Sequence, residues 1–365
     1  MPSLVLHAGF HKTGTSAIQQ FAARNRRRLL AGGVLYPRLW PAVGLAGNRP
    51  SSGHHALAHA LARLPASSTD PSDSDAVFRK ARELVQRWVD RADADGCSVL
   101  LSSEAICRYG WEENGVGEQG VNTYLERWRK LLSEFDVLPV LVVRRQDDFT
   151  RSLYQEHVAA GTGASARLAF SEFLTRAAAD KARFLERLEG FRKVFGKVRV
   201  LVYEELTGGS LPGSFLQQLD IDGLEGCVAP VVRPSLSVAE TLIKQRLNAW
   251  ILGRWQNRLV LLWLRSAAVR GIVQGELGDC TTLWSDAEVR AAFIEQFDRE
   301  NARIARDFLG RDGKLFPALH EHASTDVPPP ENARVSQTLQ RAVKAGGWRL
   351  RAILGRQAVE ELMRS

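Results

Sequence analysis

The chain has 365 residues, of which 45% are hydrophobic and 25% charged, which excludes fibrous, collagenous and wholly disordered proteins. This length allows one large α/β domain with additions, or two domains of ordinary size. With 49 Lys and Arg against 41 Asp and Glu, the net charge of +8 favours anionic partners such as nucleic acid, nucleotides, acidic glycans or acidic lipids.

Cysteine usage and the N-terminus bear on the compartment. The cysteines form no C-x-x-C pair and have no neighbouring His at a ligand spacing, so we expect no zinc site, no disulfide scaffold and a reducing environment. Met1 to Ser3 lead directly into an apolar run without a charged leader, and no uncharged run is long enough to cross a membrane. The sequence predicts a cytoplasmic protein without a bound metal.

Four short apolar runs are expected to be buried strands, at 4–8, 98–102, 137–143 and 198–203. Amphipathic helical patterns lie between them, at 16–30, 74–94, 121–135 and 170–194. This alternation predicts a parallel sheet covered by helices on both faces. Two loops rich in Pro, Gly, Ser, Asn or Asp, at 38–53 and 64–73, are expected at the rim of the active site.

The first strand is followed by a glycine-containing loop, Gly9-Phe-His-Lys-Thr-Gly-Thr-Ser16. It keeps the G-x4-G spacing of a phosphate-binding loop, but Thr15 stands where Walker A has its lysine, and Lys12 precedes Gly14 instead. Backbone N–H groups, hydroxyls and one ammonium at a helix N-terminus suit a phosphate-like anion. The alternative is an ordinary strand–helix turn with a solvated lysine.

At this loop the sequence resembles the PAPS-dependent sulfotransferase superfamily, in particular its bacterial branch, whose first strand ends in His-Lys-Thr-Gly-Thr-Ser/Thr. The resemblance implies that the loop binds the 5'-phosphosulfate of 3'-phosphoadenosine 5'-phosphosulfate (PAPS) and that Lys12 stabilises the leaving phosphate. It assigns cofactor binding to Lys12, Thr13, Gly14, Thr15 and Ser16.

A second motif strengthens the resemblance. The strand at 137–143 is followed by Arg144 and, eight positions later, by Ser152, the pair that contacts the 3'-phosphate in this family. Arg145 competes with Arg144 for this role. A guanidinium and a hydroxyl at the carboxyl end of a strand can grip a phosphate dianion.

Weaker similarities extend the match over about residues 3–316: they are Tyr203-Glu204, the segment from Arg233 to Ser237, and the segment from Asn301 to Phe316. The Arg-Lys-Gly element that clamps the nucleotide in animal cytosolic enzymes is absent, which leaves Arg233 as a candidate for that contact. The resemblance implies an α/β, P-loop-NTPase-like parallel sheet flanked by helices, with a helical C-terminal addition. We expect a PAPS-binding core at 1–235, a helical part of the same domain at 236–327 and a basic tail at 328–365.

Transfer to a hydroxyl also needs a general base. Glu104 follows the strand at 98–102, and His54 and His55 begin a helix after the loop at 38–53. We favour Glu104 over His55. In the alternative interpretation Glu104 caps the next helix or pairs with Arg108, and the histidines are surface residues at a helix start.

The segment 241–275 contains six Lys or Arg, three Trp and no acidic residue, and its spacing predicts one or two amphipathic helices. One interpretation is a core stripe with solvated arginines. The other is an element that contacts the acceptor or the surface of a membrane, because Trp stacks on sugars or sits at lipid interfaces. No nucleic-acid recognition motif accompanies the charge, so we expect no nucleic-acid partner.

Together these features predict a sulfotransferase that moves a sulfuryl group from PAPS to a hydroxyl of a carbohydrate or glycolipid. Lys12 would stabilise the leaving phosphate, and Glu104 or His55 would act as the base. One alternative is a P-loop nucleotide phosphotransferase, which needs the lysine missing after Gly14. Another is a non-catalytic protein that binds a nucleotide or an anionic glycan.

Overall fold

The computed structural model of the chain describes residues 3–39, 52–64, 76–108, 118–178, 180–221, 226–229, 235–317 and 326–364. Packing divides the chain into two compact units, which are described separately. The first unit comprises Met1–Arg145, Arg183–Val232 and Arg299–Phe316, and the second comprises Gln146–Ala182, Arg233–Asp298 and Pro317–Ser365. The chain thus leaves the first unit after Arg145 and returns at Arg183, whereas the division expected from the sequence had its boundaries at 235 and 327.

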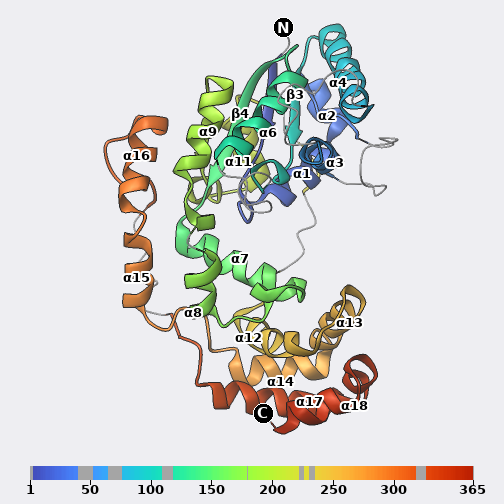
Figure 1. The fold of residues 1–365 in the computed structure, drawn as a ribbon, viewed down its shortest axis with the longest axis vertical. Helices are drawn as coiled ribbons and strands as arrows, with labels where there is room; N and C mark the ends of the chain where they lie inside the picture. The colour runs from blue at the N-terminus through green and yellow to red at the C-terminus, as the bar shows by residue number, and fades with distance from the viewer. Residues whose placement is uncertain are drawn as a thin grey trace. The chain divides into compact units, whose positions relative to one another are not determined.

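The first unit contains a parallel sheet whose described strands follow the order β2-β3-β1-β4-β5 (Figure 1). The strands are β1 (Ser3–His7), β2 (Val34–Leu35), β3 (Ser98–Ser102), β4 (Asp136–Val143) and β5 (Arg199–Val202). In this register His7, the last residue of β1, lies opposite Ser102 on one side and Val140 on the other. The α/β class with a parallel sheet flanked by helices is confirmed. The two-residue strand β2 has no signal in the sequence.

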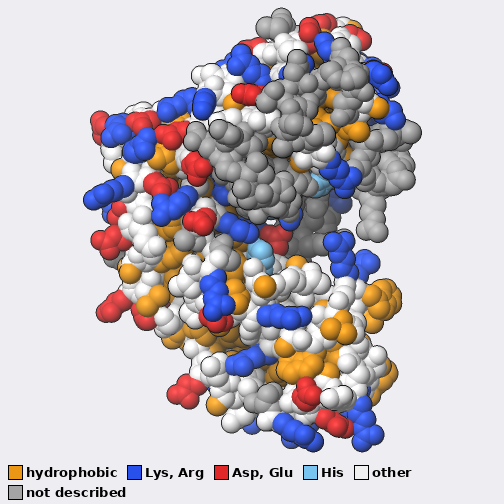
Figure 2. All heavy atoms as spheres, in the orientation of Figure 1, with side chains coloured by type: hydrophobic (Ala, Val, Ile, Leu, Met, Phe, Trp, Pro, Cys, Tyr) orange, Lys and Arg blue, Asp and Glu red, His pale blue; other side chains and the backbone are white. Residues whose placement is uncertain are grey.

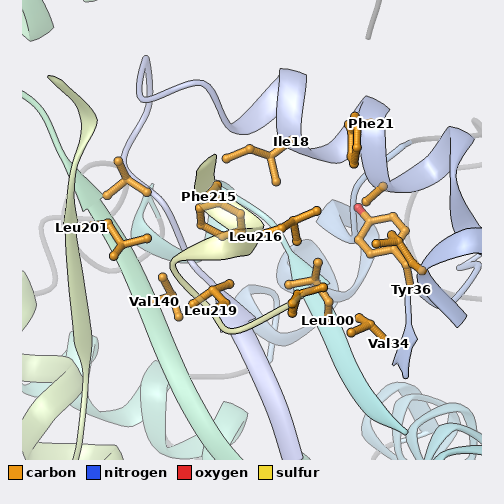
Figure 3. Close-up of a cluster of buried hydrophobic side chains, with 14 of the residues drawn as sticks. Ile18, Phe21, Val34, Tyr36, Leu100, Val140, Leu201, Phe215, Leu216 and Leu219 are labelled. Atoms are coloured by element: carbon orange, nitrogen blue, oxygen red, sulfur yellow. The ribbon is translucent and has the colours of Figure 1, made fainter. Parts of the chain in front are cut away.

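The helices of the first unit lie between these strands or follow β5. They are α1 (Thr15–Arg24), α2 (Arg26–Ala31), α3 (His55–Ala62), α4 (Ala76–Asp95), α5 (Ala105–Arg108), α6 (Glu118–Leu131), α9 (Leu185–Phe195), α10 (Tyr203–Leu206), α11 (Leu211–Gln217) and α16 (Asp298–Leu309). Side chains of α1, α2 and α11 share one hydrophobic cluster with β4, where alternate residues Val140 and Val142 face it (Figure 3). Right-handed crossovers then place α4, α6 and α9 on the opposite face.

The second unit is helical in its described parts (Figure 1). Its elements are α7 (Gln146–Ala160), η1 (Ala164–Ala166), α8 (Phe170–Phe173), η2 (Leu174–Ala178), η3 (Asp180–Ala182), α12 (Val238–Leu247), η4 (Asn248–Trp250), α13 (Arg254–Leu264), α14 (Ala267–Leu277), α15 (Ala287–Glu295), α17 (Asn332–Leu354) and α18 (Arg356–Arg364). In this part of the chain, none of the helices is both long and apolar enough to cross a bilayer, and the same is true of the described helices of the first unit.

Two helices expected from the sequence are broken. The pattern at 16–30 divides at Asn25, whose side chain bonds to the carbonyl of Phe21 and to both backbone groups of Val228. The pattern at 170–194 becomes α8, a π-helical turn (η2), η3 and α9. Its break coincides with the boundary between the units at Arg183, because a single straight helix could not bury its apolar side chains in two separate cores.

The segment expected as a basic tail forms α17 and α18. α17 buries Val335, Leu339, Val343 and Leu350, and α17 packs beside α14, as Figure 1 shows. The positive charge of this segment therefore lies on the outer side of helices that belong to the core of the second unit.

Candidate functional site

The connections that leave the two central strands, β1 and β4, run in opposite directions across the sheet. After β1 the chain turns toward β2, and after β4 it turns toward β5 on the other side. In open α/β sheets, ligands bind outside the carboxyl ends of the strands at such a reversal. The loop Ala8–Gly14 follows β1 and Arg144 follows β4, so both predicted motifs begin at this position.

The loop after β1 is held in one conformation by its own side chains. Phe10 is buried with its ring centroid 4.7 Å from that of Phe184, and Arg187 lies over the same ring. Thr13 is fully buried, and its Oγ1 donates to the carbonyl of Phe10 at 2.6 Å. Thr13 therefore offers a ligand only its backbone. Lys12 adopts a φ of 62°, a conformation that is unfavourable for a residue with a Cβ and that these contacts impose.

Helix α1 begins directly after this loop with no side chain capping it. Its N-cap, Gly14, has a φ of 82°, and no side chain of the described residues makes the capping hydrogen bond. Thr15 Oγ1 is buried in the first turn and has no hydrogen-bond partner among the described residues, while Ser16 is exposed. A helix N-terminus with free N–H groups and an unpartnered hydroxyl is suited to an anion.

Gly9 leaves room beside this hydroxyl. A Cβ at Gly9 would lie 2.9 Å from Thr15 Oγ1 and 2.7 Å from His7 Nε2, which is also buried and unpartnered. Burial lowers the pKa of His7 to about 4 against the opposing charge of Glu104, so the imidazole is neutral near pH 7. The glycine thus leaves space next to two buried polar atoms, and the residues present fit a phosphate-like group.

Arg144 connects the two motifs. Its Nη1 donates to the carbonyl of Lys12 at 2.8 Å, and its guanidinium lies 4.5 Å from the centre of the Tyr203 ring. Its Nε is buried and makes no hydrogen bond. The structure therefore places Arg144 against the loop that carries Lys12, and it holds that loop's backbone.

Beside Arg144 lies a buried carboxyl group. Glu204 accepts a hydrogen bond from the backbone N–H of Arg145 through Oε1, at 2.9 Å, and its Oε2 is unpartnered. Burial raises the pKa of Glu204 above its usual value, although that hydrogen bond and the charges of Arg144 and Arg145 oppose the rise. The Tyr203-Glu204 pair noted in the sequence is thus part of the same cluster.

Both predicted bases lie together. His55 Nδ1 lies 3.0 Å from Ser103 Oγ and 3.7 Å from Glu104 Oε2, and Gln19 donates to that same carboxylate oxygen at 2.8 Å. Burial by itself would raise the pKa of Glu104. His55, the hydrogen bonds to the carboxylate and, more weakly, His11 lower this pKa by more than burial raises it, so it lies below its usual value. Glu104 is therefore a carboxylate at neutral pH, close enough to His11 in the loop to be affected by its charge.

This arrangement differs from a hydrolase triad. In such a triad the hydroxyl and the carboxylate bond to opposite nitrogens of the imidazole. Here Ser103 and Glu104 both face Nδ1 of His55, and no described residue hydrogen-bonds to Nε2. That nitrogen is left to accept a proton from another molecule.

His54, the neighbouring candidate, is a structural residue. The backbone N–H of Ser102 donates to its Nδ1 at 3.0 Å, so the proton of the neutral ring is on Nε2, which lies 3.1 Å from the carbonyl of Pro37. Both nitrogens are occupied, and burial of the ring lowers its pKa to about 4 although the hydrogen bond to the Pro37 carbonyl opposes the shift. His54 has no free nitrogen to act as a base.

Two further residues were predicted from the sequence. Ser152 is half-buried on α7 and belongs to the second unit. Arg233 lies outside the described residues, as do most of the loops at 38–53 and 64–73. In the described residues, no three His, Cys, Asp or Glu side chains are grouped to hold a metal ion.

Gln19 and Ser103 are site residues that the sequence reasoning missed. Gln19 is a buried polar residue one turn after Thr15 on α1, and its only sequence signal is a polar side chain on the apolar face of an amphipathic helix. Ser103 has no signal beyond its position next to Glu104.

No protein-family model matches the chain, and no curated protein and no solved structure matches it. The function is therefore argued from the residues of the site.

Proposed function

We propose that the protein is a PAPS-dependent sulfotransferase with a P-loop-like sheet, acting on a hydroxyl of a carbohydrate or glycolipid. The proposal rests on the contact between the two motifs, the loop after β1 and Arg144 after β4, at the carboxyl ends of the central strands. Arg144, after β4, bonds to the carbonyl of Lys12, in the loop after β1. The adjacent helix N-terminus and the unpartnered Thr15 hydroxyl support an anionic donor at this loop.

In the proposed reaction the acceptor oxygen forms a bond to sulfur while the bond between sulfur and the 5'-phosphate oxygen breaks. The acceptor loses one proton to the base, and the leaving group is the 3',5'-bisphosphate. Lys12 and the N–H groups that begin α1 would stabilise the negative charge that develops on the leaving phosphate. Arg144 would keep the Lys12 backbone in position, in addition to the 3'-phosphate contact implied by the family resemblance.

The geometry favours His55 as the base and Glu104 as its partner. A carboxylate with a lowered pKa is a weaker base, whereas a histidine is suited to proton transfer near neutral pH. Glu104, 3.7 Å from His55 Nδ1, would stabilise the imidazolium that forms when Nε2 accepts the proton. The sequence favoured Glu104 as the base. We propose instead that His55 is the base and that Glu104 stabilises its charged form.

The test combines two measurements on the full chain. Isothermal titration should show the 3',5'-bisphosphate binding at least about tenfold more tightly than 5'-AMP or ATP, because a dianionic 3'-phosphate adds charge-assisted hydrogen bonds. Lys12→Ala should weaken this binding and lower transfer of labelled sulfate from PAPS to a cell extract by about a hundredfold or more. His55→Gln should abolish transfer while leaving bisphosphate binding within about threefold of wild type, because it removes the base but no phosphate contact.

Lys197→Ala is the matched control, because Lys197 is an exposed lysine of the same unit that pairs with Asp136. It should leave binding and transfer unchanged. Equal affinities for the bisphosphate and ATP would favour the phosphotransferase alternative. Tight bisphosphate binding without any transfer would favour a non-catalytic binding protein.

A further inference from the structure

One face of α13 combines exposed hydrophobic and cationic side chains. Arg254, Trp255, Arg258, Leu262 and Arg265 are all exposed, and their spacing of 1, 4, 8 and 11 positions from Arg254 puts them on one side of a helix. These five residues are the α13 face. Trp255 and Leu262 are 69% and 67% exposed, and Leu252, just before the helix, is 85% exposed. Large hydrophobic side chains are rarely left in water to this extent without a partner.

The opposite side of the same helix is packed. Asn257, Val260, Trp263 and Leu264 are buried, and the Trp263 indole donates to the carbonyl of Gly346 on α17 at 3.1 Å. α13 is therefore held in the second unit by its inner side, and the core does not need Trp255 or Leu262. Trp263 thus packs inside the unit, whereas Trp255 lies on its surface.

The charge of two arginines on this face, Arg254 and Arg258, is not neutralised by any described acidic side chain. Residues 241–275 contain no Asp or Glu, and no described carboxylate pairs with Arg254 or Arg258. Some exposed arginines elsewhere in the second unit have acidic partners, for example Arg270 with Glu240 and Arg341 with Glu276. Figure 2 shows hydrophobic and basic side chains next to each other at the position that α13 has in Figure 1.

We propose that the α13 face binds the surface of an anionic lipid bilayer. Helices that lie in the membrane interface combine Trp and Leu on an apolar edge with Lys or Arg on the polar edge. Trp255, Leu262 and Leu252 would enter the boundary between headgroups and acyl chains, where Trp is favoured. The arginines would lie at the level of the lipid phosphates, since each basic residue near an anionic surface adds to the attraction.

A membrane fits this face better than a second copy does. Two copies would bring Arg254 and Arg258 of one chain next to those of the other, which is unfavourable. The proposal does not depend on the proposed function, because all residues of the α13 face belong to the second unit. It would, if sulfuryl transfer is also shown, favour a lipid-linked acceptor over a soluble one.

The experiment is co-sedimentation of the full chain with vesicles of phosphatidylcholine alone, or with about a third of the lipid replaced by phosphatidylglycerol. Wild type should bind the anionic vesicles and bind them less at high salt. Arg254→Gln combined with Arg258→Gln should weaken binding about tenfold or more. Trp255→Ser combined with Leu262→Ser should weaken it to a similar extent, because it removes the side chains that enter the interface.

Arg270→Gln combined with Arg341→Gln is the matched control, because it removes the same net charge from paired, exposed arginines of the same unit. It should retain most of the binding, and circular dichroism should show all variants folded. The proposal is overturned if wild type fails to bind, if it binds neutral vesicles equally well, or if the control loses as much as the α13 variants. Self-association that Trp255→Ser and Leu262→Ser abolish, without vesicle binding, would assign the face to a second copy instead.

Discussion

At the scale of single residues, the candidate site depends on side chains that contact other residues and hold the loop of Lys12 in position. Lys12 has an unfavourable φ of 62° that Arg144, Thr13 and Phe10 maintain through contacts to its loop. A conformation of this kind, held by several neighbours, is common where a backbone must present a functional group. The sequence identified Lys12 and Arg144, but their contact, at 2.8 Å, needed the tertiary structure.

Because His54 is buried, we expect the folded state to lose stability in acid. Its pKa is about 4 in the folded chain, whereas an unfolded histidine titrates near 6.5, so between these values the unfolded state binds more protons. Stability is therefore lost as pH falls from about 6.5 to 4. His54 alone should remove about 2 kcal/mol from the free energy of unfolding between pH 7 and pH 5.

His54→Gln tests this by urea unfolding at both pH values. Gln can accept from the Ser102 N–H and donate to the Pro37 carbonyl, as His54 does, without titrating. The variant should lose about 2 kcal/mol less than wild type between pH 7 and pH 5. His55→Gln removes a partly exposed histidine and should change this difference less. An unchanged difference in His54→Gln would show that its protonation does not govern acid stability.

At the scale of elements, the start of α1 sets the position of the candidate anion site. Gly14 ends the loop with a φ of 82°, and a Cβ there would lie 2.6 Å from Leu211 Cδ2 on α11. Both restrictions favour glycine, one from the backbone and one from the neighbouring helix. α11 belongs to the hydrophobic face shown in Figure 3, so packing of that face sets the position of the loop.

Gly14→Ala should lower the free energy of unfolding by about 2 kcal/mol or more and weaken bisphosphate binding, because it distorts the start of α1. Gly33→Ala is the matched control: its φ is 79°, but a Cβ there meets no atom within 4 Å. Gly33→Ala should lower the free energy of unfolding by about 1 kcal/mol, because only the positive φ is unfavourable there. Adding Leu211→Ala to Gly14→Ala should improve bisphosphate binding. Equal losses of stability in the two glycine variants would show that the contact with Leu211 does not matter.

At the scale of the whole molecule, positive charge is found both around the candidate site and on the second unit. Residues 1–69, which include the loop with Lys12, contain eight Lys or Arg and no acidic residue, and the basic stretches 241–275 and 331–365 belong to the second unit. In the second unit these stretches form helices with packed inner sides. The net charge of +8 therefore bears both on the unit that holds the candidate site and on surfaces such as the α13 face.

Removal of residues 331–365 tests whether the C-terminal segment is part of the core. The truncated chain should aggregate or lose at least about 3 kcal/mol of stability, because it exposes the sides of α13 and α14 that pack on α17. Size-exclusion chromatography and thermal unfolding measure both effects. The matched control keeps the helices and replaces Arg349, Arg351, Arg356 and Arg364 by Gln, and it should remain monomeric. A monomeric truncated chain with an unchanged unfolding midpoint would instead identify a dispensable tail.

The sequence by itself determined the alternation of strands and helices, and therefore a parallel sheet, because buried strands and amphipathic helices have distinct periods. It also singled out Lys12, Arg144, Glu104 and His55, because polar groups directly after buried strands or at helix starts are unusual enough to notice. It could not show that Glu104 and His55 form one pair or that His54 is occupied by Pro37 and Ser102. Those facts depend on which strands are neighbours, and long-range packing decides that order. The breaks at Asn25 and between α8 and α9 have the same origin, since local periodicity does not record which core a side chain enters.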